Sequence, residues 1–267
     1  MNNIEKLVRA RRSVRTFDGR DVKKEDREKL YAFMENIENP YGLPVEFRLL
    51  EKMGCPVVVG TELYVGAKMK DALHINEAVG FAFEKLVLYA QSLGIGTVWI
   101  GGTMDRAAFE KKMELAEDEV MPAVSPLGYP ANKMSVRETM MRKGIKADDR
   151  LGFESIVYWN DFTQPLTPDA AGKLFLPLEM VCLAPSAVNK QPWRMVVTDD
   201  VVHFYLQRSK GFGGGKLDMQ KIDLGIALCH FDLMAKELGI QTEFALSEPD
   251  ISHPDGTEYI ASYKFKL

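Results

Sequence analysis

The stretch GFAFEKLVLYAQSLGIGT, residues Gly80–Thr97, recurs later in the chain as GIALCHFDLMAKELGIQT, residues Gly225–Thr242. The two copies are 145 residues apart, and eight of their 18 positions are identical. Each copy has the pattern of a largely apolar, buried helix that ends at a glycine and is followed by the start of a strand. The alternative to a true internal repeat is chance similarity between two buried helices.

Matches outside the two helices favour the repeat. With the same offset Pro40 aligns with Pro185, and one extra residue brings Phe47 opposite Trp193. Helices and strands are mixed along the chain, which is typical of an α+β fold. The sequence therefore predicts an α+β protein of two degenerate repeats, residues 1–150 and 151–267, that together form one compact unit.

Each half is predicted to be built around its long helix. In the first half we expect helices near 3–12, 24–36, 73–93 and 135–142, and strands near 46–51, 56–59, 96–100 and 122–128. In the second half we expect helices near 168–183 and 218–238, and strands near 194–198, 201–207 and 242–246.

The composition is that of an ordinary globular protein. The chain has 267 residues, of which 46% are hydrophobic, and a formal net charge of −4. This charge gives no general attraction to nucleic acid or to an anionic membrane, and no apolar run approaches the roughly 20 residues that span a bilayer. The first residues lack the apolar core of a signal peptide. We therefore expect a cytoplasmic protein.

The cysteines and histidines indicate no metal site. Cys55, Cys182 and Cys229 form no Cys-x-x-Cys pair, and the four histidines show no metal-ligand spacing. Cys182 and Cys229 stand in apolar surroundings, so we expect buried small side chains rather than reactive thiols.

The decapeptide APSAVNKQPW, residues Ala184–Trp193, is the first candidate ligand site. A Pro-Ser pair ends an apolar helical run, Asn189 and Gln191 offer amide donors and acceptors, and Trp193 begins a strand-like run. Backbone N–H groups, amides and an aromatic plane in one place can hold a flat heterocycle. The alternative is a plain connection from helix to strand with two helix-stopping prolines.

The segment RARRSVR, residues Arg9–Arg15, is the second candidate. Guanidinium groups fit phosphate oxygens and a serine hydroxyl adds a short donor, whereas the alternative is a solvated basic turn at a helix C-terminus. In the repeat, Arg11–Arg15 aligns with Ile156–Asn160, which has no cation. Conversely, Ala184–Trp193 aligns with Asn39–Phe47, which has lost the serine, asparagine and glutamine. This pattern predicts one composite site built from both halves and a second site that has decayed.

Three further stretches are weaker candidates. Thr97–Thr103 has the pattern of a strand that opens into two glycines, which allow a ligand ring close to the backbone. Leu127–Pro130 ends another strand and precedes basic residues that could contact a phosphate. Either stretch could equally be an ordinary strand end or solvated surface. Gly211–Lys216 lacks the spacing of a phosphate-binding P-loop and is interpreted as a flexible loop.

Together these motifs resemble those of the FMN-dependent nitroreductase family. That family opens with an Arg-Arg/His-Ser-x-Arg/Lys segment, matched by Arg11–Arg15, and carries an A-P-S-x-x-N-x-Q-P-W loop, matched by Ala184–Trp193. Its L-G-I/L-G-x-x-W-I-G-G segment is matched by Leu93–Gly102, and its G-Y-P strand end by Gly128–Pro130. The resemblance covers nearly the whole chain.

The order of the motifs departs from that of ordinary family members, which are homodimers with FMN contacted by both subunits. Here the decapeptide lies in the second repeat and the arginine segment in the first. The chain therefore resembles the single-chain subgroup, in which a fused pseudo-dimer replaces the two subunits. This resemblance implies one FMN per chain and a monomer, with a homo-oligomer left open.

The resemblance also implies which residues bind FMN. The phosphate and ribityl chain would contact Arg11, Arg12, Ser13, Arg15, Arg142 and Lys143. The isoalloxazine ring would lie beside Ile100, Gly101 and Gly102. The second half would contribute Pro185, Ser186, Ala187, Asn189 and Gln191. A cation such as Arg15 near the N1/C2 edge of the ring would stabilise the reduced flavin.

The implied activity is electron transfer from NAD(P)H, a transient donor, through FMN to a small electron-poor acceptor of the nitroaromatic or quinone type, by a ping-pong mechanism. The chain lacks the Gly-x-Gly-x-x-Gly fingerprint of a nicotinamide-binding Rossmann unit, which fits transient binding of the nucleotide. Two alternatives stay open, because fold does not determine function. One is a different flavin reaction, such as flavin fragmentation, dehalogenation or dehydrogenation, and the other is a non-catalytic FMN-binding protein.

Overall fold

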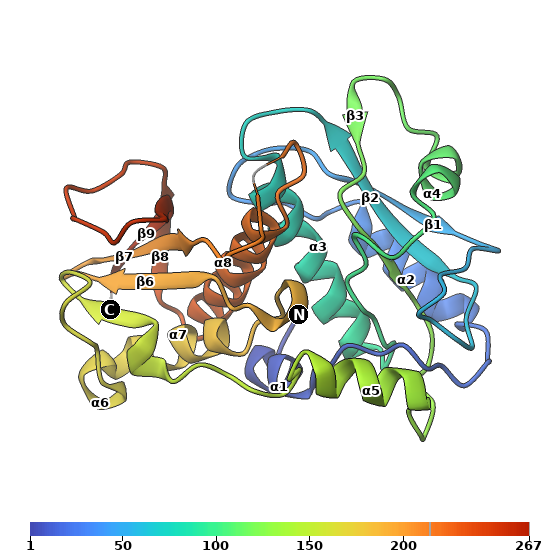
Figure 1. The fold of residues 1–267 in the computed structure, drawn as a ribbon, viewed down its shortest axis with the longest axis horizontal. Helices are drawn as coiled ribbons and strands as arrows, with labels where there is room; N and C mark the ends of the chain where they lie inside the picture. Colours follow the sequence, from blue (N-terminus) through green and yellow to red (C-terminus); the bar gives the residue numbers. More distant parts are fainter. Residues whose placement is uncertain (214, 267) are drawn as a thin grey trace. The chain divides into compact units, whose positions relative to one another are not determined.

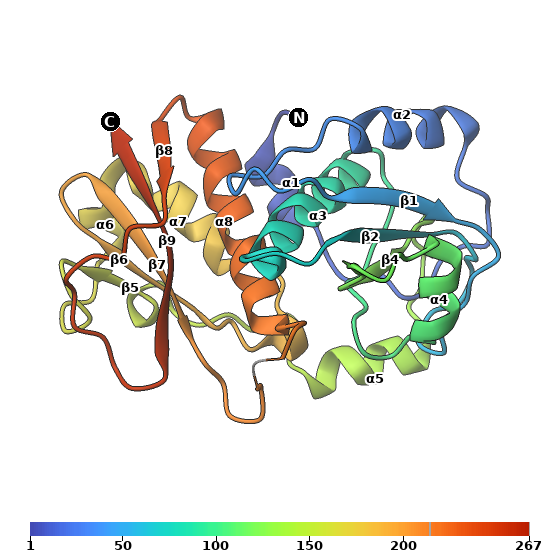
Figure 2. The same ribbon diagram turned by 90° about the horizontal axis from the view of Figure 1, so that it is seen from above.

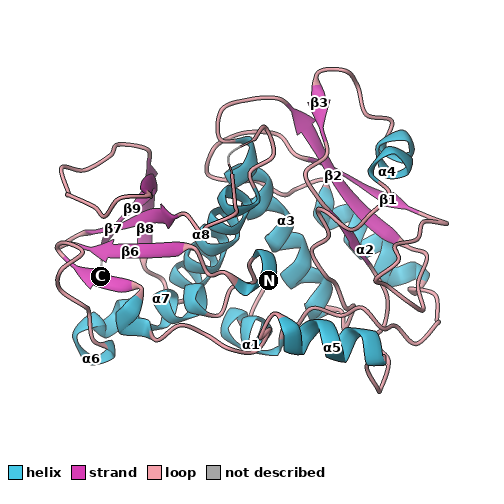
Figure 3. Cartoon of the chain, viewed as in Figure 1, coloured by secondary structure: helices cyan, strands magenta, loops and turns pink. Residues whose placement is uncertain are grey.

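The computed structural model describes residues 1–213 and 215–266, and the chain divides into two units (Figure 1). Unit 1 consists of Met1 and Ala10–Ala147, and unit 2 consists of Asn2–Arg9 and Asp148–Leu267. Figure 3 shows that each unit combines helices with a sheet of its own. The mixed α+β character expected from the sequence is therefore confirmed in each unit.

The first helix, α1 (Ile4–Ala10), belongs almost entirely to unit 2, although it was expected in the first half of the chain, residues 1–150. Two polar contacts hold it there. The Ile4 N–H donates to the Glu237 carboxylate at 2.7 Å, and Arg9 pairs with Glu179 at 2.5 Å.

The sheet of unit 1 consists of β1 (Glu46–Leu50), β2 (Tyr64–Lys70), β3 (Glu119–Val120) and β4 (Val124–Pro126). The central strand is β2, which pairs antiparallel with each of the other three (Figure 2). No strand was predicted over β2, and strands were expected at 56–59 and 122–128 instead. The first of these is wrong, and the second is confirmed only in its middle.

Helices cover both faces of this sheet. Successive side chains of a strand point to opposite faces, so each strand can contact helices on both sides. On one face, the Phe47 ring lies 5.6 Å from Phe83 of the long helix α3 (Ile75–Ser92). On the other, Tyr64 lies 5.2 Å from Phe109 of α4 (Arg106–Met113), a helix that the sequence did not predict. The remaining helices of unit 1 are α2 (Lys24–Met34) and α5 (Val136–Gly144), both close to the expected positions.

An extended segment after α1 crosses unit 1 through isolated bridges instead of a regular strand. Ser13 bridges Thr97 and Thr16 bridges Val59, both in parallel orientation. The stretch expected as a strand at 96–100 also makes only isolated bridges, so that expectation is wrong in detail. Each segment here pairs at single residues with several others, and no two run together long enough to form a ladder.

Glycines allow these segments to approach one another. A Cβ on Gly128 would lie 2.8 Å from the Phe17 ring, and a Cβ on Gly96 would lie 3.0 Å from Val14. Gly60, with φ +86°, would place a Cβ in a clash with the Phe17 carbonyl oxygen. These three glycines therefore have a structural reason that is independent of any ligand.

The sheet of unit 2 has the order β5-β6-β7-β9-β8. Its strands are β5 (Val157–Trp159), β6 (Trp193–Val197), β7 (Val201–Gln207), β8 (Gln241–Ala245) and β9 (Thr257–Lys266). Only the β5–β6 pair is parallel. The sequence predicted β6, β7 and β8 correctly, but it missed β5 and β9. The latter has no counterpart in the first repeat from which it could have been inferred.

One face of this sheet is covered by the long helix α8 (Met219–Glu237), beside α7 (Phe175–Cys182) (Figure 2). Aromatic rings join the layers: Phe231 of α8 lies 5.5 Å from Phe204 and 5.2 Å from Tyr263. Both expected cysteine positions on these helices are confirmed as buried, and burial raises the pKa of the Cys182 thiol to about 12.

The helix expected at 168–183 is broken into three pieces: α6 (Pro168–Ala171), a 3-10 turn (Gly172–Leu174) and α7. The break falls at Gly172, whose φ of +53° lies outside the helical region. Two more 3-10 turns, at Phe153–Ser155 and Ala187–Asn189, complete the helical segments.

The repeat corresponds to one shared motif in each unit. An antiparallel strand pair is followed by a long buried helix, β1-β2-α3 in unit 1 and β6-β7-α8 in unit 2. The two strands are 13 residues apart in unit 1 and three residues apart in unit 2. A fixed offset therefore aligned the helices but misaligned the strands before them. Among the described helices, none is long and apolar enough to cross a membrane.

Candidate functional site

The arginine segment of unit 1 lies in the extended stretch between α1 and α2. Its backbone is held on both sides: the Val14 N–H donates to Thr97 O at 2.8 Å, and the Val59 N–H donates to Arg15 O at 2.9 Å. Val14 and Phe17 are buried on either side of Arg15 and Thr16, which are partly buried. Arg11, Arg12, Ser13 and Arg15 are all partly buried.

Arg15 has the least satisfied side chain of this segment. Its Nε and Nη1 atoms are buried and have no hydrogen-bond partner among the described residues. Burial lowers the pKa of Arg15, the Glu138 carboxylate nearby raises it, and the Arg142 guanidinium lowers it further. Buried donors are nearly always paired in folded proteins. These two donors therefore have hydrogen-bonding capacity that a further acceptor would satisfy.

Glu138 provides the counter-charge to the arginines, and the sequence analysis did not identify it. It is 1% exposed, and its Oε1 lies 3.6 Å from Arg12 Nη1. Its Oε2 accepts a hydrogen bond from the Thr16 hydroxyl at 2.7 Å. A signal was present: Ser135-Val-Arg-Glu138 is a capping box, and Ser135 does cap α5 by accepting from the Glu138 N–H at 3.1 Å.

The basic residues of α5 differ from one another. Arg142 Nη1 donates to the Ser13 carbonyl oxygen at 3.5 Å, which brings it to the arginine segment as expected. Lys143, the next residue on the helix, is exposed. Unit 1 thus brings together Arg12, Ser13, Arg15 and Arg142, with Glu138 among them.

The stretch Ile100–Gly102 follows directly on the Thr97 bridge. Ile100 is buried and bridges Val124, and the Gly101 carbonyl accepts from Arg106 Nη2 at 2.8 Å. Gly102 is exposed, and a Cβ there would meet nothing within 4 Å. Nothing in the fold of the described residues therefore requires glycine at position 102, in contrast to Gly96 and Gly128.

The loop at Ala184–Trp193 in unit 2 is strained and internally bonded. Val188, Asn189 and Gln191 have φ of 44°, 58° and 49°, values that non-glycine residues rarely adopt. The Gln191 N–H donates to Ser186 Oγ at 2.8 Å, which closes the turn. Pro185, Ser186 and Ala187 are partly buried at its start.

The two side-chain amides of this loop form hydrogen bonds to the neighbouring segment 149–151 of unit 2. Asn189 Nδ2 donates to the Asp149 carbonyl at 3.0 Å, and Asn189 Oδ1 accepts from Arg150 at 3.3 Å. Gln191, which is buried, accepts from the Leu151 N–H at 2.9 Å. Both amides therefore make intramolecular hydrogen bonds. The sequence analysis did not identify Arg150.

Asp223 of α8 anchors the same loop. Its two carboxylate oxygens both accept from the Ala187 N–H, at 3.0 and 3.1 Å. Burial raises its pKa well above the ordinary value, the Ala187 hydrogen bond lowers it, and the charge of Asp218 raises it. A buried carboxyl therefore fixes the strained loop at the residue where its 3-10 turn begins.

Trp193 does not have the surface role that the sequence analysis gave it. Its side chain is fully buried, and the residue pairs with Leu206 in the sheet. The indole ring is part of the core, so the expected aromatic plane at the end of the decapeptide is wrong.

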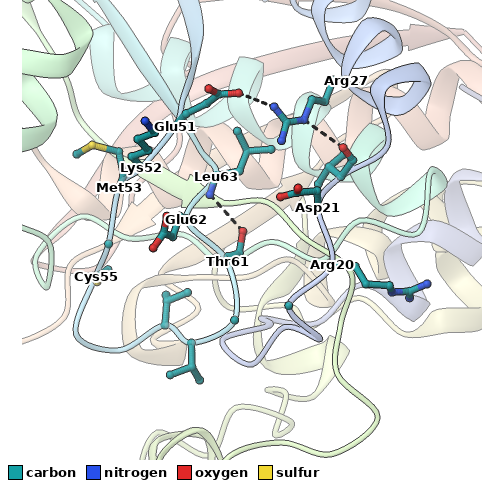
Figure 4. A pocket seen from close by; sticks show the side chains of 16 residues that line it. Arg20, Asp21, Arg27, Glu51, Lys52, Met53, Cys55, Thr61, Glu62 and Leu63 are labelled. Carbon is teal, nitrogen blue, oxygen red and sulfur yellow. Dashed lines mark hydrogen bonds and ion pairs between the residues drawn. The ribbon is translucent and has the colours of Figure 1, made fainter.

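A cavity of about 880 Å³ lies elsewhere in unit 1, between segments 19–22 and 51–63 (Figure 4). Arg27 in its wall donates to Glu51 at 2.5 Å and to the Val22 carbonyl at 3.1 Å. No residue expected to bind a cofactor lines this cavity. Within the described residues, no group of three or more His, Cys, Asp or Glu could hold a metal ion. Gly214, part of the loop at 211–216, lies outside the described residues.

Comparison with protein families gives one match. The profile of the family described as "Putative TM nitroreductase" matches residues 3–235. No curated protein sequence matches the chain.

Among solved structures, the chain is similar to a protein described as a putative nitroreductase from Thermotoga maritima. The two are 22% identical with a TM-score of 0.62, and the match covers 99% of this chain and 93% of that one. At this identity the likeness shows a shared fold.

Two shorter proteins each match about half of the chain. One is described as an FMN-dependent nitroreductase from Clostridium difficile, with 17% identity, a TM-score of 0.42, and coverage of 51% of this chain and 94% of that one. The other is described as a putative NADH dehydrogenase/NAD(P)H nitroreductase from Bacteroides thetaiotaomicron, with 21% identity, a TM-score of 0.43, and coverage of 51% and 90%.

Proposed function

The chain belongs to the family described as "Putative TM nitroreductase", and from this premise we propose that it is an FMN-dependent oxidoreductase. It passes electrons from NAD(P)H to an electron-poor small molecule of the nitroaromatic or quinone type. The observation that carries the proposal is the pair of buried Arg15 donors without a hydrogen-bond partner among the described residues.

The residues of unit 1 fit the phosphate of FMN. Arg12, Arg15 and Arg142 lie around one short stretch of backbone, and a phosphate dianion would supply the acceptors that Arg15 lacks. Guanidinium groups suit phosphate because their donors match its oxygens in pairs. Arg11 and Ser13 belong to the same stretch, and Lys143 lies at its edge on α5.

We propose further that residues of both units bind a single FMN. Support comes from what each repeat retains. The segment Ile156–Asn160 has no cation to replace the arginines of unit 1, and Asn39–Phe47 has no counterpart of the polar decapeptide. Pro185, Ser186, Ala187, Asn189 and Gln191 are the contribution of unit 2 in this proposal. One site per chain needs no second subunit, so the active species is a monomer.

FMN when bound supplies hydride and single-electron transfer, the chemistry that the side chains lack. The chain's own residues bind and orient it. The arginines hold the phosphate and contribute positive charge, which favours the reduced, anionic state of a flavin. Gly102 leaves open space beside the backbone, which a flat ring could occupy. The donor NAD(P)H and the acceptor would bind in turn against the exposed face of that ring.

The test is the visible absorption spectrum of the purified chain, with FMN quantified per chain before and after anaerobic addition of NADH or NADPH. We expect one FMN per chain that either nucleotide bleaches and a quinone restores. Two FMN per chain would refute the single shared site. Bound FMN that neither nucleotide reduces would indicate a non-catalytic binder, and reduction without turnover of quinones or nitroaromatics would indicate another flavin reaction.

A further inference from the structure

Glu138 has one carboxylate oxygen that the protein satisfies and one that it does not. Oε2 accepts the Thr16 hydroxyl at 2.7 Å. Oε1 is buried and has no hydrogen-bond partner among the described residues. Its closest ionic contact is Arg12 Nη1 at 3.6 Å, which is beyond hydrogen-bonding distance.

The orientation of this carboxylate is fixed from both sides. The Thr16 hydroxyl accepts from the Ser135 N–H at 3.0 Å, so its one proton is free to point at Glu138 Oε2. The Glu138 N–H in turn donates to Ser135 Oγ, which fixes the residue in the first turn of α5. Oε1 is therefore held toward the arginine segment by bonds that the rest of the carboxylate makes.

An unsatisfied carboxylate oxygen in a buried position is costly, and nothing in the fold requires it. Leaving a buried charged acceptor without a donor destabilises the folded protein. The hydrogen bond from the Thr16 hydroxyl already satisfies the other carboxylate oxygen, Oε2, and joins Glu138 to the rest of unit 1. The second oxygen stands beside Arg12 and within electrostatic range of Arg15, whose own donors lack an acceptor. Unmatched donors and an unmatched acceptor lie in the same small region.

We propose that Glu138 is a cofactor-binding residue whose Oε1 accepts a hydrogen bond from a hydroxyl group next to the bound phosphate. The inference rests on the proposed function and deepens it. The ligand class is a phosphate monoester of a polyol, because its phosphate offers acceptors for Arg15 and a neighbouring hydroxyl offers a donor for Glu138. The ribityl phosphate of FMN has both, whereas inorganic phosphate offers no such polyol hydroxyl.

The direct test replaces Glu138 by glutamine. Glu138→Gln keeps the side-chain shape, and the cap of α5 is unaffected because Ser135 Oγ accepts from the backbone N–H of residue 138. Its carbonyl oxygen can take the Thr16 hydrogen bond, and the amide NH₂ then stands at the position of Oε1, where it cannot accept. Glu119→Gln is the matched control, because Glu119 is a partly buried carboxylate of the same unit that pairs with Lys68 at 2.8 Å.

The measurements are dissociation constants for FMN, by quenching of flavin fluorescence, and for inorganic phosphate, by calorimetry. We expect Glu138→Gln to weaken FMN about tenfold, the value of one hydrogen bond to a charged group. Inorganic phosphate should bind equally well or more tightly, because a negative charge beside the arginines is gone. Glu119→Gln should change neither constant.

Two results would overturn the role of Glu138: unchanged or tighter FMN binding in Glu138→Gln, or an equal loss for FMN and phosphate. Glu138→Asp gives a second test, because it keeps the charge but withdraws the oxygen by one methylene. If Glu138 acts only as a counter-charge, Glu138→Asp should bind FMN as tightly as the wild type. If Oε1 contacts FMN, the variant should bind FMN more weakly. If the wild-type chain binds no FMN, the proposed function fails. The role of Glu138 is then decided by comparing the dissociation constants of ribose 5-phosphate and inorganic phosphate in the same variants.

Discussion

The two candidate segments, Arg11–Arg15 in unit 1 and Ala184–Trp193 in unit 2, are rich in polar groups but use them differently. In unit 1, buried donors on Arg15 and a buried acceptor on Glu138 have no hydrogen-bond partner among the described residues. In unit 2, both amides, the Ser186 hydroxyl and the Ala187 N–H all make hydrogen bonds within the unit. The first segment therefore has unmet charged groups, whereas the polar residues of the second are bonded and its one buried unmet donor among the described residues is Nε1 of Trp193, in the core beyond the loop.

This difference separates two ways of preparing a binding site. Unsatisfied buried groups destabilise the free protein and are compensated when a ligand arrives. A bonded, strained loop instead holds its backbone in place before the ligand binds. Substitutions of Arg15 or Glu138 should therefore affect binding far more than stability, and those in the loop of unit 2 should affect both.

The largest effect is expected from Arg15→Met. We predict that FMN affinity falls about 100-fold, because two hydrogen bonds to a charged group are lost. The free energy of unfolding of the FMN-free protein should not fall, and it should rise by on the order of 1 kcal/mol, since a buried cation without hydrogen-bond acceptors for two of its nitrogens is removed. Flavin fluorescence and urea unfolding measure the two quantities.

Arg27→Met is the matched control for this substitution. Arg27 donates to Glu51 and to the Val22 carbonyl, so its loss should reduce stability and leave FMN affinity unchanged. If Arg15→Met destabilised the FMN-free protein as Arg27→Met does, the contrast between unmet and satisfied arginines would be wrong.

A smaller and mixed effect is expected from Asn189→Ala. The substitution removes hydrogen bonds to Asp149 and Arg150, and alanine tolerates the φ of +58° less well than asparagine. We predict a loss of about 1–2 kcal/mol in unfolding free energy and about tenfold weaker FMN binding.

Asn189→Gly separates the causes, because glycine accepts the positive φ but also lacks the amide. Weaker FMN binding in both variants would support a contribution of unit 2 to the cofactor site. Full FMN affinity in both would limit the site to unit 1.

Asp223→Asn should change the pH dependence of stability. The pKa of Asp223 is raised in the folded protein, chiefly by burial, so the native state binds more protons than the unfolded state above the ordinary pKa. Unfolding free energy therefore falls as pH rises from the ordinary aspartate pKa to the raised one, and the loss is complete above that window. Asparagine can still accept from the Ala187 N–H but does not titrate.

We thus expect the variant to have a flatter stability profile and to gain on the wild type as pH increases through that window. Thermal unfolding at several pH values measures this. A difference between the two proteins that is constant with pH would contradict the raised pKa.

Much of the fold could be predicted because the long helices carry strong patterns. The helices α3 and α8 and the strands β6 and β7 were found from hydrophobic runs and their glycine ends. The strand β2 was missed because an offset derived from the helices does not hold across connections of unequal length. The strand β9 was missed because it has no partner in the first repeat, and single bridges such as Ser13 to Thr97 have no sequence pattern.

The site was predictable only where a motif could be recognised. The arginines were identified by residue type, whereas Glu138, Asp223 and Arg150 were missed because their roles depend on tertiary contacts. A capping-box glutamate or a helical aspartate has the same local pattern whether it faces water or a buried arginine. Trp193 shows the opposite error, because an aromatic residue next to a polar loop was taken for a surface although it belongs to the core.

The smallest effect is expected from substituting two glycines, which compares a position with free space beside the backbone and a position that the fold fills. Gly102→Ala should leave the stability of the FMN-free protein unchanged, because a Cβ meets nothing within 4 Å, yet it should weaken FMN several-fold if the ring lies against this backbone. Gly128→Ala should instead destabilise the FMN-free protein by roughly 1–3 kcal/mol, the cost of overpacking, because its Cβ would lie 2.8 Å from the Phe17 ring. Glycine is thus required at position 128 by the packing of the fold, and we expect it to be required at position 102 by the ligand. If Gly102→Ala bound FMN as tightly as the wild type, the second requirement would be lost, and with it the assignment of the ring to this stretch.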